Sequence, residues 1–450
     1  MKQLIIIFLL AIAIQGCTIC KPYSRPNITT DSLFGNVQNQ ENKTLATLPW
    51  QEFFTDTYLR GLIEKGLEKN TDFNIARLKV EAAEAVLMNA RLSYLPSATL
   101  TAEGTVTDFG HSSTKSYNIA TAASWEIDAF GKRLNTKRGA KAALEGSRAY
   151  ERAVKVRLIA AIANSYYTLL MLDRQLTISK QTVESWEDME KTFTILKKAG
   201  KSNEIAVLQA KSSRMALQAN MLSLQKNRKE TENSLSSLLA TTPQSIERGN
   251  LEKQTFPEKL SIGFPIQLLS YRPDVQQAEY ELAQAFYATN VTRLAFYPDI
   301  TLSGITGWTN NGGGNIVNPG SWLLNSMGAL TQPLFNRGTN RANLKVAQTR
   351  QKEAAFLFQQ SLLNAGKEVN DALTQVQTAK KRRLLNKEQI NSLQEAVSKT
   401  KYLMRYSSIN YLDVLTARQN LLNAEQTEIQ DCFDEIQGMI NLYHALGGGS

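Results

Sequence analysis

Two stretches of the chain alternate apolar and polar residues with a period of two, and each continues into a second alternating stretch after a turn. Between Pro96 and Asp108, small and aliphatic residues hold every second position, and threonine holds most positions between them. Such alternation predicts a strand with one apolar and one polar face. We expect four strands, paired as two hairpins, at residues 97–109, 117–128, 299–309 and 322–332. Strands of this length can span a bilayer when they are tilted. A soluble hairpin with one solvent-exposed face has the same pattern.

Long helical tracts follow both hairpins. No proline interrupts residues 97–242, and after Gly131 apolar residues recur at alternating steps of four and three, which is coiled-coil spacing. We expect this helix to end near Gly200, because glycine is the common residue just past a helix end. A second helix is expected to begin at Ser202 or Asn203, both of which are helix-capping residue types.

The C-terminal half shows the same sequence of elements. A long helix is expected from Gly338 to about Arg405, and a last helix follows it. This last helix keeps an apolar residue at every seventh position, namely Leu415, Leu422, Ile429, Ile436 and Tyr443. A strict seven-residue period predicts partner helices with matching seams.

The chain contains an internal duplication. Arg91–Leu100 and Arg293–Leu302 share the pattern Arg-Leu-small-aromatic-apolar-Pro-polar-apolar-Thr-Leu, at an offset of 202 residues from 91 to 293. Further matches lie at offsets of 205, from Phe130 to Phe335, and 207, from Leu208 to Leu415. A slowly growing offset is what a duplicated unit with small loop insertions produces.

Proline-rich segments delimit the two copies. We expect the first copy at residues 51–242 and the second at 266–446, each made of helices and one hairpin, at 97–128 and 299–332. Residues 243–265, with three prolines, form the linker. Residues 17–50 form an extended N-terminal arm, and 447–450 form a C-terminal tail.

The N-terminus has the character of a targeting segment. Lys2 gives a positive start, and Leu4–Ile14 is an apolar run too short for a stable membrane span. Ile14-Gln15-Gly16-Cys17 then resembles a bacterial lipobox, although Gln15 is atypical. We expect residues 1–16 to be a removed signal peptide and Cys17 to be acylated, with an ordinary secretory signal as the alternative. Multiple acyl chains anchor stably where one does not.

Charge and composition narrow the function classes. The net charge of +10 makes nucleic acid a formal possibility, but the charges are spread along helices, and the densest run, Lys380–Arg383, is read as a solvated helix face. The sequence holds two histidines, three cysteines and no Cys-x-x-Cys pair. No metal site, cofactor or nucleic-acid partner is expected. No nucleophile elbow or phosphate loop occurs, so we expect no enzyme.

Four amphipathic strands are too few to close a barrel, since the smallest membrane barrels have about eight. An open sheet edge is not stable in lipid. If the strands span a membrane, several copies must pool them, and the helices must pool into a second tube. Threonine, serine, asparagine and glutamate on the polar face would make the interior wet, and the product is a hollow duct.

Several motifs together resemble the TolC-like outer-membrane factor family. They are the duplicated Pro-x-apolar-Thr-Leu segments, Trp125–Gly131, Gln332–Gly338 and Tyr411–Arg418. Arg272–Val275 and the lipobox resemble the lipoprotein branch that serves resistance–nodulation–division efflux pumps. The resemblance implies an α+β membrane protein: a homotrimer in which four strands per chain build one transmembrane β-barrel, continuous with a long periplasmic α-helical barrel. It also implies a periplasmic adaptor, an inner-membrane pump and outer-membrane lipid as partners, in the outer membrane of a Gram-negative cell.

The resemblance further places a periplasmic gate at the helix turns near Gly200 and Ser407. Asp413 is similar to the gate aspartate of the family, and Arg405 and Tyr411 are candidates for a pair across the closed tip. Asp413 is equally well explained as a first-turn carboxylate that favours the helix dipole. In the first copy its counterpart is Ala206.

The function we expect is the passive exit duct of a tripartite efflux system. A duct for type I polypeptide secretion and a coiled-coil envelope scaffold without transport are the alternatives. The exported substrate, whether drug, metal or polypeptide, is not specified by the sequence.

Overall fold

The structure is a computed structural model. It describes residues 20–26, 48–108, 110, 113–256, 272–310, 320–406 and 411–448. The signal segment 1–16 and Cys17 lie outside these residues, as do Ser407 and the side chain of Arg405.

The two copies have the same order of elements and nearly the same helix lengths. In the first copy, α4 (Thr71–Leu92) has 22 residues, α5 (Lys132–Lys198) has 67 and α6 (Glu204–Leu238) has 35. In the second, α8 (Pro273–Leu294) has 22, α9 (Thr339–Tyr406) has 68 and α10 (Tyr411–Ala445) has 35. The repeat read from the sequence is therefore a repeat of structure.

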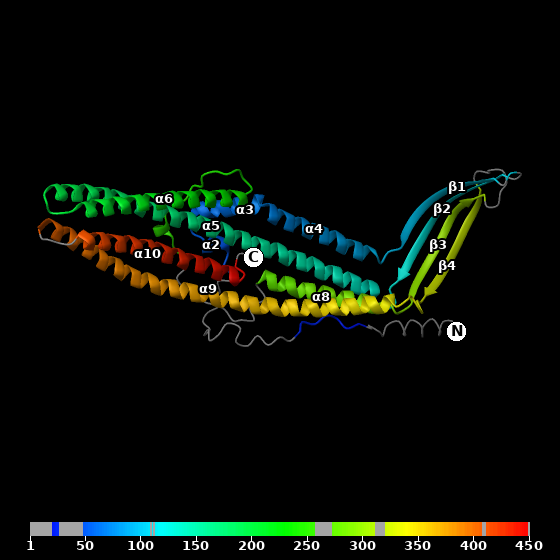
Figure 1. Cartoon of the computed structure of the whole chain (residues 1–450). Helices are drawn as coiled ribbons and strands as arrows, with labels where there is room; N and C mark the ends of the chain where they lie inside the picture. The colour runs from blue at the N-terminus through cyan, green and yellow to red at the C-terminus, as the bar shows by residue number, and fades with distance from the viewer. Residues whose placement is uncertain are drawn as a thin grey trace. The chain divides into compact units, whose positions relative to one another are not determined.

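The chain divides into two compact units, which are described separately. The first contains residues 1–28, 78–149 and 276–360, and the second contains residues 29–77, 150–275 and 361–450. Figure 1 shows the four-stranded sheet, which belongs to the first unit, and the long helices α5 and α9, each of which contributes residues to both units.

The sheet of the first unit is antiparallel throughout, in the order β1-β2-β3-β4. Its strands are β1 (Ser97–Asp108), β2 (Ser113–Ile127), β3 (Asp299–Thr309) and β4 (Ser321–Thr331). The two expected hairpins thus form, and they also pair with each other through β2 and β3. β1 and β4 remain as the two edges of the sheet.

One expected boundary was wrong. β2 begins at Ser113 rather than Tyr117, so the expected turn at 110–115 is shorter. Lys115 pairs with Val106 and Ser113 with Asp108, which extends the ladder through polar positions. Strand pairing uses backbone groups, so a ladder can continue after side-chain alternation has ended.

The second unit is built around a buried core that follows the helical periodicity. Its short elements are α2 (Trp50–Phe53), α3 (Thr57–Lys69) and the 3-10 turn η2 (Leu251–Lys253). Phe53 stacks on Tyr443 of α10, with ring centroids 4.2 Å apart, and both rings are almost completely buried. This contact joins the start of the first copy to the end of the second.

Asp56 organises a polar node beside this core. Its carboxylate accepts hydrogen bonds from the backbone nitrogens of Tyr58 and Leu59 and so caps α3. Its second oxygen accepts a hydrogen bond of 2.8 Å from the hydroxyl of Tyr166, which in turn accepts one from the backbone nitrogen of Gly249. A single acidic residue therefore connects α3, α5 and the loop after α6.

Among the described residues, no helix is both long enough and apolar enough to cross a membrane.

Candidate functional site

The register of the sheet gathers apolar residues on one face. Ala102 pairs with Ile119, Ile119 with Trp308, and Trp308 with Trp322, so one apolar row crosses all four strands. Directly paired residues share a face of a sheet. Most apolar side chains on this face are exposed in the single chain, and they include Leu100, Val106, Leu324 and Leu330. The face is apolar but uncovered.

The neighbouring row is polar across the whole sheet. Glu103 pairs with Asn118, Asn118 with Thr309, and Thr309 with Ser321. Because successive residues of a strand point to opposite faces, this row lies on the face opposite the tryptophan row. The two-faced strands expected from the sequence are therefore aligned into a two-faced sheet.

Tryptophans mark two levels of the apolar face. The rings of Trp308 and Trp322 meet edge to face, with centroids 5.1 Å apart. Trp125 pairs with Leu302, six residues from Trp308 on β3, so it lies about 20 Å away along the strands. Its indole nitrogen donates a hydrogen bond of 2.8 Å to the backbone oxygen of Tyr94.

Ion pairs hold the sheet where its strands meet the helices of this unit. Lys132 lies 3.0 Å from Asp299, and Arg133 lies 2.8 Å from Glu126. Asp128 accepts hydrogen bonds from the backbone nitrogens of Arg133 and Leu134 and so fixes the start of α5. These charged contacts place the start of α5 relative to β2 and β3.

The helix turn of the first copy ends as the sequence predicted. The backbone nitrogen of Lys201 donates to the oxygen of Leu196, and that of Gly200 donates to the oxygen of Lys197. Gly200 has a φ of 71°, a conformation that glycine adopts without strain, so these two hydrogen bonds form a Schellman motif at the end of α5. Asn203 then caps α6 by accepting a hydrogen bond from the backbone nitrogen of Ala206.

The second copy differs at the equivalent level. Asp413 is exposed in the first turn of α10, while its counterpart Ala206 is fully buried. No ion pair involves Asp413 within the described part of the chain. Tyr411 packs its ring edge to face against Phe193 of α5, at a centroid distance of 6.4 Å. The structure thus brings Tyr411 to the end of α5, and the expected pair of Arg405 with Tyr411 stays a prediction.

Sequence reasoning missed a buried arginine at the start of α8. Arg272 is only 3% exposed and donates two hydrogen bonds to Asp274, one of 2.8 Å to Glu368 and one of 2.7 Å to the backbone oxygen of Ala445. Burial alone would raise the pKa of Asp274, but the hydrogen bonds and charge of Arg272 outweigh it and hold that pKa below its usual value. The sequence signal for this residue is the motif Arg272–Val275, which carries the family resemblance.

Arg418 was also missed as an individual residue. It is partly buried on α10, and its Nε has no hydrogen-bond partner among the described residues. Burial lowers its pKa, and the charge of Asp188 on α5 opposes that shift. A charge in this environment is costly unless a partner compensates it.

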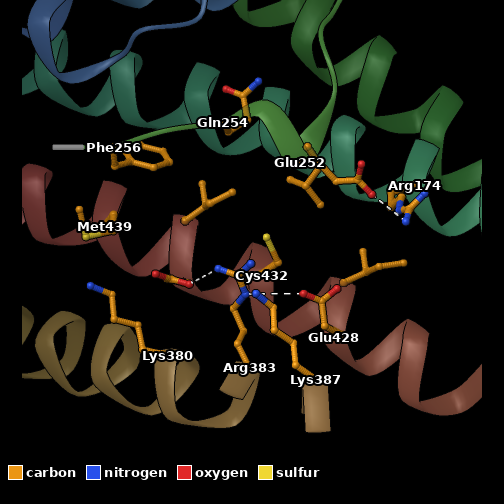
Figure 2. Close-up of a pocket in the computed structure, with 14 residues that line it drawn as sticks. Arg174, Glu252, Gln254, Phe256, Lys380, Arg383, Lys387, Glu428, Cys432 and Met439 are labelled. Atoms are coloured by element: carbon orange, nitrogen blue, oxygen red, sulfur yellow. Dashed lines mark hydrogen bonds and ion pairs between the residues drawn. The ribbon is translucent and has the colours of Figure 1, made fainter. Parts of the chain in front are cut away.

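A pocket of about 530 Å³ lies within the second unit between α5, η2, α9 and α10 (Figure 2). Arg383 of α9 donates a hydrogen bond of 2.5 Å to Glu435 and lies 3.7 Å from Glu428, both on α10. Arg174 lies 2.7 Å from Glu252 across the same pocket. Burial raises the pKa of the Cys432 thiol in its wall. The ion pairs across this pocket connect neighbouring elements of the second unit.

No group of three or more His, Cys, Asp or Glu side chains placed to hold a metal ion is found in the described ranges.

Two segments, residues 62–241 and 265–448, match the family model of the outer membrane efflux protein. The chain belongs to the outer membrane efflux protein family. The cation efflux system protein CusC of Escherichia coli K12 is 27% identical to this family member, over 98% of each chain. The probable outer membrane lipoprotein SilC of Salmonella typhimurium is 28% identical, over 98% of this chain and 97% of its own.

The fold agrees with this membership. The open state of the MtrE outer membrane channel of Neisseria gonorrhoeae superposes with a TM-score of 0.87 at 27% identity, over 96% of this chain and 98% of MtrE. This outer membrane efflux protein therefore acts in the outer membrane as the exit duct of an efflux system.

Proposed function

We propose that three copies of this chain pool their sheets into one twelve-stranded transmembrane barrel, continued by a periplasmic barrel of helices. The observation that carries this proposal is the sheet with one mainly apolar face and two free edges, β1 and β4. Four strands are too few for a barrel, and lipid does not tolerate an unpaired strand edge. Joining β4 of each chain to β1 of the next removes every edge.

The spacing of the tryptophans supports the same assembly. Membrane barrels carry aromatic girdles on both sides of an apolar band about 25 Å tall. Trp125 and the Trp308–Trp322 pair lie on the apolar face at levels about 20 Å apart along the strands. In the assembled barrel this face meets lipid, and the row containing Glu103 and Asn118 faces the water-filled lumen.

We infer the register of the joint between two chains from the offset of 205 residues that relates Phe130 to Phe335. Leu330 lies 205 residues after Trp125, and Leu302 lies 202 residues after Leu100. Trp125 pairs with Leu302 within one chain. The equivalent joint pairs Leu330 with Leu100 of the neighbouring copy, and both of these side chains belong to the apolar face.

Exposed side chains beside the joint fit this arrangement. Phe130 packs on Tyr297 within one chain, with centroids 5.3 Å apart. The equivalents of these two residues are Phe335 and Leu95, which are 87% and 63% exposed. In the trimer, Phe335 of one copy covers Leu95 of the next, as Phe130 covers Tyr297.

A periplasmic adaptor and an inner-membrane resistance–nodulation–division pump are the partners that an exit duct of this kind needs. The duct itself is passive, and the pump selects the substrate. CusC is named for cation efflux, so cations are one candidate cargo; drugs and polypeptides are others. We assign no catalytic activity or cofactor.

Two finer assignments complete the proposal. Cys17 carries acyl chains after removal of residues 1–16, so the trimer is anchored by lipid as well as by its barrel. Asp413, with Arg405 and Tyr411, forms the gate at the periplasmic end of the helical barrel. The exposed carboxylate of Asp413 in the first turn of α10 supports the second assignment.

Cross-linking between copies tests the joint. In a chain with Cys20→Ala and Cys432→Ala, we expect Leu100→Cys with Leu330→Cys to form covalent trimers on oxidation. The matched control is Leu100→Cys with Ala329→Cys, which places the second thiol on the other face and should not cross-link. Native mass spectrometry in detergent should show three chains. A stable monomer, or equal cross-linking of both pairs, would contradict the proposal.

A further inference from the structure

The pocket of about 530 Å³ between α5, η2, α9 and α10 has walls of two kinds (Figure 2). Part of its lining is apolar and includes Phe256, Ile436 and Met439. Another part is contributed by α9 and is positively charged, with Lys380 and Lys387 on it. The volume lies within the range of about 300–1,000 Å³ that sites for small molecules occupy. A hollow of this kind suits a ligand with an apolar body and one charged group.

Three cationic side chains lie on the same face of α9. Lys380, Arg383 and Lys387 are spaced by three and four residues, which places them on neighbouring turns. Figure 2 shows all three extending from α9 toward α10. Neither lysine has a hydrogen bond or an ion pair within the part of the chain that the structure describes. A negative group beside Arg383 would therefore be attracted by three positive charges.

The carboxylates that line the pocket are already next to arginines. Glu435 accepts a hydrogen bond of 2.5 Å from Arg383, and Glu428 lies 3.7 Å from the same guanidinium. Glu252 lies 2.7 Å from Arg174. The acidic groups of the pocket thus have cationic partners, and the charge of the two lysines is left uncompensated.

The Nε–H group of Arg383 is a hydrogen-bond donor without an acceptor. The Nε atom is buried and has no hydrogen-bond partner among the described residues. The carboxylate of Glu428, at 3.7 Å, is too far away to accept from it. A buried donor without an acceptor is unfavourable, and an oxygen atom in the pocket would satisfy it. The positive charges around it favour an anionic oxygen.

Cys432 adds no negative charge to the pocket. Burial raises the pKa of its thiol, and the positive charge of Arg383 opposes that shift. The thiol therefore remains protonated at neutral pH. With four cationic side chains against three carboxylates in its lining, the pocket keeps a positive excess.

We propose that this pocket binds an amphiphilic carboxylate, with its charged group beside Arg383 and between the two lysines, and its apolar chain against Phe256 and Met439. The site lies within one chain, so it does not depend on the proposed trimer. A medium-chain fatty acid has this chemistry, and sodium decanoate is the probe for it. Bound there, the ligand contacts α9, α10 and the segment after η2 together and stabilises their packing.

The thiol of Cys432 reports whether the pocket is occupied. With the full chain in lipid nanodiscs, alkylation by N-ethylmaleimide is followed by mass spectrometry of the peptide that contains Cys432, so the other cysteines do not interfere. At ten times its half-protecting concentration, decanoate should slow this alkylation about tenfold, because only the unoccupied fraction reacts. Neutral decanol and decyltrimethylammonium, which has the same chain and the opposite charge, should leave the rate nearly unchanged.

Lysine variants test the charge requirement. Lys380→Gln with Lys387→Gln should raise the half-protecting concentration of decanoate about tenfold. The matched control is Lys367→Gln with Lys381→Gln, which removes the same charge from exposed positions of α9 outside the pocket and should have no effect. Each variant is compared with its own rate without decanoate, because Lys387 also lowers the pKa of the Cys432 thiol.

A decanoate with a diazirine near the end of its chain locates the site. We expect light-induced adducts on peptides that contain Phe256 or residues 429–439, and competition by unmodified decanoate. Four results would each overturn the proposal: no protection by decanoate, equal protection by decanol or decyltrimethylammonium, equal effects of the two lysine pairs, or adducts confined to the strands.

Discussion

Arg272 donates a hydrogen bond of 2.7 Å to the backbone oxygen of Ala445, which lies 173 residues further along the chain. The same guanidinium binds Asp274 and Glu368. One buried side chain therefore joins the start of the second copy to the end of its last helix, where backbone oxygens lack helical partners.

Arg272→Met should destabilise the second unit. Methionine has an apolar side chain of similar length, but it leaves the Ala445 oxygen and the carboxylates of Asp274 and Glu368 without their hydrogen-bond donor. Because both carboxylates are about half exposed, water compensates part of the loss, and we expect a cost of about 2 kcal/mol. The thermal midpoint in detergent measures it. Arg148→Met is the matched control, since its ion pair is solvated, and the midpoint should hardly move.

His444 should make stability depend on pH. Burial lowers its pKa below 6.5, and the charges of Arg272 and Arg157 add to the shift, while Glu368 and Asp274 oppose it. The unfolded chain therefore binds the proton more readily than the folded chain. Stability from this residue is complete above pH 6.5 and falls as the pH drops below that value.

His444→Gln should flatten this dependence. We expect the difference in thermal midpoint between about pH 7.5 and about pH 5.5 to shrink in the variant. Asp274 affects stability in a different pH range. Because its pKa is lowered in the folded chain, its contribution to stability is lost only as the pH falls below about 4. An unchanged difference between the two pH values would show that His444 is not the titrating group.

Most helices and strands of the fold could be predicted from the sequence, because the local spacing of apolar residues determines them. The helices of both copies, the turn at Gly200 and the two faces of each strand follow from spacing and from a few prolines and glycines. What local patterns do not contain is pairing across long separations. The β2–β3 ladder joins the two copies, and Arg272 finds Glu368 and Ala445 only after the helices have packed. The ring contact of Tyr411 with Phe193 of α5 likewise joins residues that are far apart in the sequence.

Gly307 is the position in β3 where a side chain is least tolerated. A Cβ there would collide with the backbone oxygen of Ile119 and lie 2.5 Å from Cα of Ala120 on β2. Gly307→Ala should therefore weaken the β2–β3 ladder and lower the yield of folded protein. Gly304→Ala in the same strand is the control, because its nearest neighbour would be 3.6 Å away. Refolding yields in lipid vesicles compare the two; equal yields would contradict the expectation.

The variant Asp413→Ala distinguishes a gate role of this residue from a role in stabilising the start of α10. Three close carboxylates at the tip of a trimer would repel and attract a divalent or trivalent cation. The variant should therefore weaken cation block of single-channel current in planar bilayers. Losing a first-turn carboxylate should also cost about 0.3–1 kcal/mol of helix stability. Unchanged block with lower thermal stability would assign Asp413 to the helix start alone.

Cys17→Ser should abolish incorporation of labelled fatty acid. Folding of the strands needs no acyl group, so we expect the barrel still to assemble, with looser retention in membranes stripped by high salt. The mass of the N-terminal peptide provides the second readout. Equal labelling of the variant and the unsubstituted chain would rule out Cys17 as the attachment point.

The free edges of the sheet have a consequence for how the cell must handle this chain. β4 has 11 residues, with no proline and no charged side chain, so it lacks the features by which soluble proteins discourage strand addition. Any strand that meets it can extend it, and in the proposed trimer the correct one belongs to another copy. The feature that drives assembly is thus also a hazard for each newly exported chain. Its concentration between synthesis and insertion has to stay low, and overproduction should yield aggregates before it yields more channels.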